Sequence, residues 1–128
     1  MKGRLLRNGA AVLAIGIMLA VAAPARGDST NTCLKVVNNR SRTTTVTVRG
    51  YDEKNSWWSF APGESAYLTM DGSPIRSASF TIYLYEGDGI NNSQSLAGDN
   101  KFVDWKFDPE SQDHGRCQDG SEVVTLHD

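Results

Sequence analysis

The chain has 128 residues, with 13 Lys and Arg against 15 Asp and Glu, so its formal net charge is −2 at pH 7. This length suits a single domain of ordinary size. Nucleic acid and anionic lipid both attract basic surfaces, so a slightly acidic chain with scattered carboxylates predicts neither as a partner.

The first 25 residues show the features of an export signal in their usual order. Three basic side chains lie within the first seven residues, and an apolar run follows from residue 10 to residue 23. Ala23-Pro24-Ala25 then offers the small-x-small pattern of a cleavage site. The apolar run is shorter than the roughly 20 residues that a membrane-spanning helix needs. We therefore predict that residues 1–25 are a signal peptide.

Removal of that segment would leave residues 26–128 as one secreted or periplasmic domain. The mature domain would carry ten Lys and Arg against fifteen Asp and Glu, a formal charge of −5. We expect no membrane insertion after cleavage. Asn39 and Asn91 each begin an N-x-S sequon, which would be glycosylated only if the export route is eukaryotic.

The two cysteines of the chain, Cys33 and Cys117, stand near opposite ends of the predicted mature domain. Export brings a protein into an oxidising compartment, where paired cysteines form structural disulfides. The chain has no C-x-x-C motif, the usual pattern of a redox or metal-binding pair. We predict one Cys33–Cys117 disulfide.

The mature region is rich in the two-residue alternation of β-strands and poor in helical periodicity. A typical run is 43–52, in which Thr alternates with Val46 and Val48. Short polar or Pro-Gly segments separate the runs. The predicted strands are 32–39, 43–52, 56–60, 65–70, 77–87, 101–107 and 122–127. Seven short strands in one domain predict an all-β, antiparallel two-sheet sandwich of immunoglobulin-like architecture.

Catalytic motifs are absent from the sequence. His114 and His127 are the two histidines, and neither accompanies a nucleophile motif such as G-x-S-x-G. A pair of carboxylates that act together in a small hydrolase is not visible from sequence, so that alternative stays open. We expect no enzyme activity and no cofactor.

The longest predicted connection, 86–100, is polar. Glu86, Asp88, Asn91 and Asp99 carry oxygen ligands of the kind that calcium prefers, but they do not have the spacing of an EF-hand loop. We predict a solvated surface loop without a metal, and keep a calcium site as an alternative.

Trp57 and Trp58 are adjacent in the third predicted strand. Successive side chains of a strand point to opposite faces, so only one of the two rings is expected in the core. Phe60 shares a face with Trp58 and is the more apolar companion. The pattern predicts that Trp58 is buried and that Trp57 is exposed.

Other aromatic side chains also fall on the face opposite to the predicted core. Tyr83 and Tyr85 alternate with apolar residues of their strand, and Tyr51 follows the second strand. Such rings either stabilise the outer side of a sheet as cross-strand pairs or form a binding surface. We predict an exported, non-catalytic binding module that engages a protein partner through Trp57, Tyr51, Tyr83 and Tyr85. A carbohydrate-binding module, in which these rings stack on a polysaccharide, is the alternative.

Overall fold

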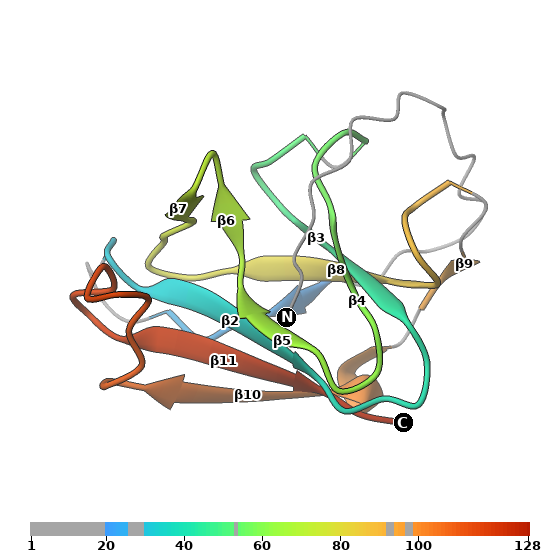
Figure 1. The fold of residues 1–128 in the computed structure, drawn as a ribbon. Coiled ribbons are helices and arrows are strands. Elements are labelled where there is room, and N and C mark those ends of the chain that lie inside the picture. The colour runs from blue at the N-terminus through green and yellow to red at the C-terminus, as the bar shows by residue number, and fades with distance from the viewer. Residues whose placement is uncertain (1–19, 26–29, 53, 92–93, 97–98) are drawn as a thin grey trace.

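The computed structural model describes residues 20–25, 30–52, 54–91, 94–96 and 99–128. Within these residues it is all-β, with eleven strands and one short 3-10 helix (Figure 1). The described part of the chain contains no helix that could cross a lipid bilayer. Most of the predicted signal peptide lies outside the described residues.

The first sheet consists of β1 (Val21–Ala22), β8 (Thr81–Glu86), β3 (Thr44–Val48) and β4 (Trp58–Phe60), in that order. A fifth strand, β9 (Gln94–Ser95), also pairs with β8. All of these pairings are antiparallel. β3 pairs along one edge of β8. β1 and β9 therefore pair with the other edge of β8, at opposite ends of that strand.

The second sheet has the order β10 (Val103–Asp108), β11 (Ser121–Leu126), β2 (Cys33–Asn38) and β5 (Ser65–Tyr67). Its strands β2 and β11 run parallel, which corrects the expectation of purely antiparallel sheets. Parallel neighbours need a long connection, and here most of the domain lies between the two strands. Side-chain alternation gives no information on strand direction, so the sequence pattern could not reveal this pairing.

A small hairpin joins β6 (Thr69–Met70) to β7 (Ser73–Pro74). Asp71 and Gly72 form its turn, with φ angles of 53° and 83°. Two consecutive positive φ angles are typical of a type I′ turn, for which Asp-Gly is a favoured sequence. The 3-10 helix, Asp99–Phe102, directly precedes β10.

The strand count exceeds the predicted seven because of short additional pairings. Four of the eleven described strands, β1, β6, β7 and β9, have two residues each. Two residues are too few to show alternation, so a sequence pattern cannot reveal them. Each of the seven longer strands overlaps one of the seven predicted runs.

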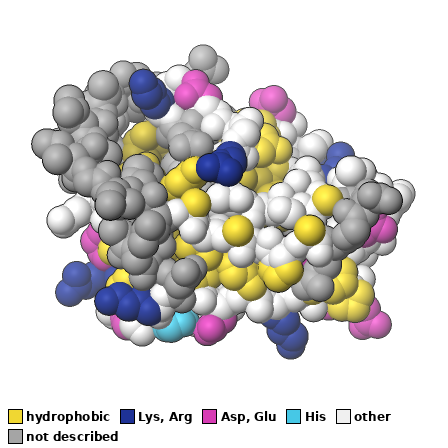
Figure 2. All heavy atoms as spheres, turned by 180° about the vertical axis from the view of Figure 1, so that it is seen from behind, with side chains coloured by type: hydrophobic (Ala, Val, Ile, Leu, Met, Phe, Trp, Pro, Cys, Tyr) yellow, Lys and Arg dark blue, Asp and Glu magenta, His cyan; other side chains and the backbone are white. Residues whose placement is uncertain are grey.

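One hydrophobic core contains side chains from both larger sheets. Its members follow the predicted alternation, because every second residue of β2, β8 and β11 is buried. Among them are Leu34, Val36, Ile82, Leu84, Val124 and Leu126. Figure 2 shows the side of the molecule that faces away from the viewer in Figure 1. On that side, hydrophobic side chains lie over the middle of the face and most charged side chains lie toward its edge.

The predicted disulfide between Cys33 and Cys117 is present, with its Cα atoms 5.6 Å apart. Both cysteines are fully buried. The backbone N–H of Cys33 donates to the carbonyl of Gly120, and the N–H of Cys117 donates to Oε1 of Gln112. The bridge therefore attaches the start of β2 to the loop that leads into β11.

Replacing both cysteines, as Cys33→Ala with Cys117→Ala, should lower the free energy of unfolding by about 4–5 kcal/mol. This is the chain-entropy figure for a loop of this size; the cysteines are 84 residues apart in sequence. Urea unfolding of the oxidised wild type, the reduced wild type and the double variant measures it. The two forms without the bridge should unfold at similar urea concentrations, and an unchanged midpoint in both would contradict the prediction.

Candidate functional site

Trp57 is buried, and the prediction that it is exposed is wrong. Its exposed fraction is 2%, against 1% for Trp58. The two rings do lie on opposite faces, as alternation requires, because Trp58 belongs to the core shared by the sheets and Trp57 to a separate cluster. That second cluster contains Tyr85 and Ile90, with Tyr83 packed against it.

The chain that follows β8 covers Trp57. The N–H of Gly89 donates to the hydroxyls of Thr45 and Ser59, at 2.7 and 3.1 Å. The Thr45 hydroxyl also donates to the carbonyl of Gly87 at 2.6 Å. These hydrogen bonds hold the segment after β8 against the outer face of β3 and β4, which excludes water from the Trp57 ring.

The four aromatic residues predicted as a binding surface do not lie together on one exposed face. Trp57, Tyr83 and Tyr85 gather in the covered cluster, where Tyr85 is buried and Tyr83 is half-buried. Tyr51 lies elsewhere, with its ring edge-on to Trp58 at a centroid distance of 6.3 Å. Burial raises the pKa of Tyr51 above the usual tyrosine value. The structure thus assigns these rings mainly to packing.

Trp57→Ala should destabilise the protein about as much as Trp58→Ala, by roughly 3–5 kcal/mol, the usual range for truncating a buried aromatic side chain. Trp105→Ala provides a control, because Trp105 is only half-buried on β10. Urea unfolding followed by far-UV circular dichroism compares the three variants. A Trp57→Ala protein as stable as the wild type would show that the ring is exposed in solution.

Gly89→Ala should destabilise the cover over Trp57. Gly89 has a φ of +99°, and a Cβ atom built there would lie 2.9 Å from Cη2 of Trp57. Backbone strain and overpacking together should cost about 1–3 kcal/mol. Gly50→Ala is the matched control, since Gly50 has a similar φ of +96° and open space around it. Equal losses in the two variants, measured by urea unfolding, would show that Trp57 does not restrict this position.

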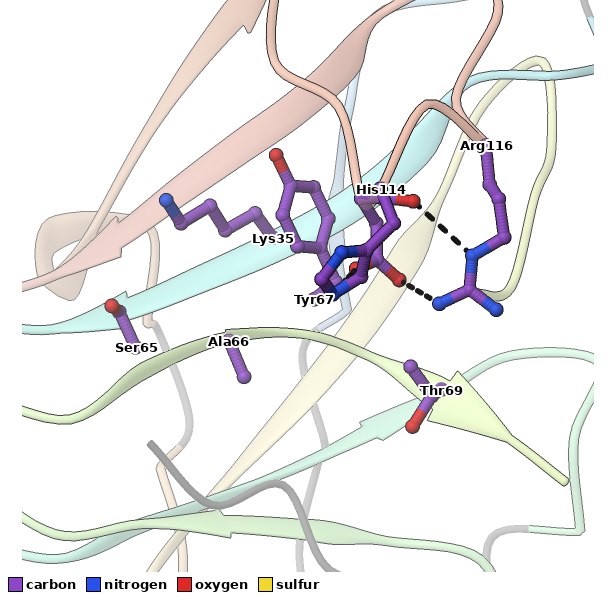
Figure 3. Close-up of a pocket in the computed structure, with 8 residues that line it drawn as sticks. Lys35, Ser65, Ala66, Tyr67, Thr69, His114 and Arg116 are labelled. Carbon is purple, nitrogen blue, oxygen red and sulfur yellow. Dashed lines mark hydrogen bonds and ion pairs between the residues drawn. The ribbon is translucent and has the colours of Figure 1, made fainter. Parts of the chain in front are cut away.

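A pocket of about 410 Å³ lies on the outer side of the second sheet and is open to solvent (Figure 3). It is built from β2, from β5 and the start of β6, and from the loop that carries Cys117. The residues that line it are Lys35, Ser65, Ala66, Tyr67, Thr69, Asp113, His114 and Arg116.

Strand register places an aromatic ring and a cation together in this pocket. Lys35 of β2 is the direct cross-strand partner of Tyr67 of β5. Leu34 and Val36 point into the core, so alternation turns Lys35 outward. Its Nζ lies 5.5 Å from the centroid of the Tyr67 ring, within the range of a cation–π contact. The Tyr67 hydroxyl is hydrogen-bonded to the Ser111 hydroxyl.

The loop before Cys117 supplies the other charged groups. Nη2 of Arg116 lies 2.8 Å from a carboxylate oxygen of Asp113, and Nη1 donates to the carbonyl of Gly72. These contacts hold the Arg116 guanidinium in place and neutralise the negative charge of the Asp113 carboxylate. The His114 side chain is 87% exposed beside them. Lys35 and Arg116 together face the single carboxylate of Asp113, so the described pocket lining carries excess positive charge.

Among these lining residues, the sequence pointed only to His114, as a candidate catalytic side chain. His127 lies at the end of β11, with Nε2 3.3 Å from Asp104, and does not line this pocket. No motif marked Lys35 or Tyr67. Alternation in the two predicted strands indicated that both side chains face outward. Their contact with each other depends on the pairing of β2 with β5, which alternation does not predict.

The structure also describes part of the loop that was considered for calcium. Its Glu86 carboxylate is 2.9 Å from the guanidinium of the buried Arg40, which also donates to the Thr44 hydroxyl. Among the described residues, no three His, Cys, Asp or Glu side chains are grouped as metal ligands would be.

The chain matches no family model, no curated protein and no solved structure.

Proposed function

We propose that this chain is an exported, non-catalytic binding module that holds an acidic segment of a protein partner in the pocket between β2, β5 and the loop before Cys117. The observation that carries the proposal is the placement of the Lys35 ammonium against the ring of Tyr67, in a pocket that Arg116 and His114 also line. An aromatic ring beside cationic groups suits a peptide that combines apolar side chains with carboxylates.

The scaffold supports this proposal. Of the described strands, seven have three or more residues, four of them in the second sheet and three in the first. This division and the shared core fit a two-sheet sandwich of immunoglobulin-like architecture, which we propose as the fold class. A buried disulfide is compatible with export of the chain to an oxidising compartment.

The composition of the pocket favours binding over hydrolysis. Among the described residues that line it, Asp113 is the single carboxylate, and it is paired with Arg116. Glycoside hydrolysis generally requires two carboxyl groups that act together. The Lys35 ammonium also covers part of the Tyr67 ring, which leaves less of that ring free to stack on a sugar.

Lys35→Gln should weaken the binding of an acidic peptide by about two- to fivefold, the range expected for one exposed ion pair. A fluorescent octaglutamate peptide is a suitable probe, and fluorescence anisotropy measures its affinity. Lys54→Gln is the matched control, because it removes one exposed positive charge that does not line the pocket. Binding by the wild type should also weaken as salt rises from about 0.05 to 0.15 M, since salt screens exposed charges.

Equal loss of affinity in Lys35→Gln and Lys54→Gln would contradict the pocket as the site, as would absence of peptide binding. Retention of the wild type on cellulose, chitin or peptidoglycan, lost on Tyr67→Ala, would instead assign the pocket to carbohydrate.

A further inference from the structure

Strand β1 fills one half of an edge of β8. Val21 pairs with Ile82, Ala22 pairs with Thr81, and the N–H of Ala23 donates to the carbonyl of Phe80 at 2.7 Å. The backbone of this short segment therefore supplies hydrogen-bond partners for part of the β8 edge.

The side chains of this segment alternate between core and solvent. Val21 is 2% exposed and Ala23 is 5% exposed, and both belong to the core that contains Phe80 and Ile82. Ala22 between them is exposed. The segment thus closes the core with a small apolar side chain at every second position.

The same residues lie within the segment that the sequence predicts to be removed on export, residues 1–25. Cleavage after Ala25 would take away a strand that completes the folded domain. Phe80 and Ile82 would lose their cover, and the backbone groups that face β1 would lose their partners. Unpaired sheet edges of this kind readily accept an added strand.

We propose that this half of the β8 edge is a strand-binding site, which residues 21–23 fill in the full chain and an extended segment of a partner protein fills after export. The partner segment carries small apolar side chains at two positions separated by one residue, because Val21 and Ala23 occupy the site in that pattern. The inference rests on the predicted cleavage and is independent of the acidic-peptide pocket, which lies on the other sheet.

The rest of the edge limits what can bind. β9 pairs with Tyr85 and Glu86, and the N–H of Leu96 donates to the carbonyl of Leu84 at 2.9 Å. An added strand can therefore extend along β8 only from Phe80 to about Tyr83. The same cover prevents two copies of the chain from pairing along their whole β8 strands, so a short partner segment fits better than a second copy.

The experiment uses the protein exported from the full-length chain. Mass spectrometry first identifies its N-terminus, which we expect after Ala25. A labelled peptide of sequence AVAAPA, residues 20–25, is then titrated by fluorescence anisotropy, and hydrogen exchange follows the amides from Phe80 to Tyr83. We expect saturable binding and added protection of the Ile82 amide, which faces the β1 edge, whereas the Thr81 and Tyr83 amides face β3 and should not change.

Two variant peptides distinguish strand addition from general adhesion. Val21→Asp places a carboxylate in the core and should weaken binding at least about tenfold, because burying an unpaired charge is costly. Ala22→Asp changes the side chain that faces solvent and should alter the affinity by less than about threefold.

Equal affinities for the two variant peptides would overturn the proposal, as would failure of the AVAAPA peptide to bind. An exported chain that still begins upstream of Val21 would also overturn it, because the site would then remain filled. A stable dimer of the exported chain that the peptide cannot dissociate would assign the edge to a second copy. None of these results bears on the effect of Lys35→Gln in the pocket.

Discussion

The parallel pairing of β2 with β11 is the contact on which the other features of this protein depend. It places the first long strand of the described domain beside the last, with Cys33 opposite Ser121 and Asn38 opposite Leu126. The Cys33–Cys117 bridge attaches the loop before β11 to the start of the same pair. A single long-range contact thus joins the two ends of the domain, extends the second sheet and holds the 113–116 turn above the Lys35 and Tyr67 pair.

The first sheet differs from the second in what covers its outer face. The turn after β8 bonds through Gly89 to hydroxyls of β3 and β4, and Trp57 becomes part of a second, smaller apolar cluster. Burying the polar groups of this turn is tolerated because each of the hydroxyls has a hydrogen-bond partner. The aromatic side chains that alternate away from the main core therefore stabilise the sheet and its cover.

The two proposed sites recognise a partner in different ways. The pocket beside Tyr67 would select its ligand by side-chain charge, so its affinity depends on salt. The edge of β8 would select a segment by backbone hydrogen bonds and by the size of two apolar side chains, so its affinity depends little on salt. They lie on different sheets, which allows one partner or two to occupy them.

The sequence by itself determined which residues form long strands and which side chains share a face. Alternation located all seven of the longer described strands and placed Trp57 and Trp58 on opposite faces of the first sheet. The cysteine count indicated the disulfide. Only the tertiary structure decided that β2 and β11 are parallel, that a turn covers Trp57, and that Lys35 meets the loop before Cys117. The reason is that a two-residue period encodes the direction of a side chain relative to its own strand. Which segment packs against that side chain depends on contacts between residues far apart in the chain. A local sequence pattern does not predict such contacts.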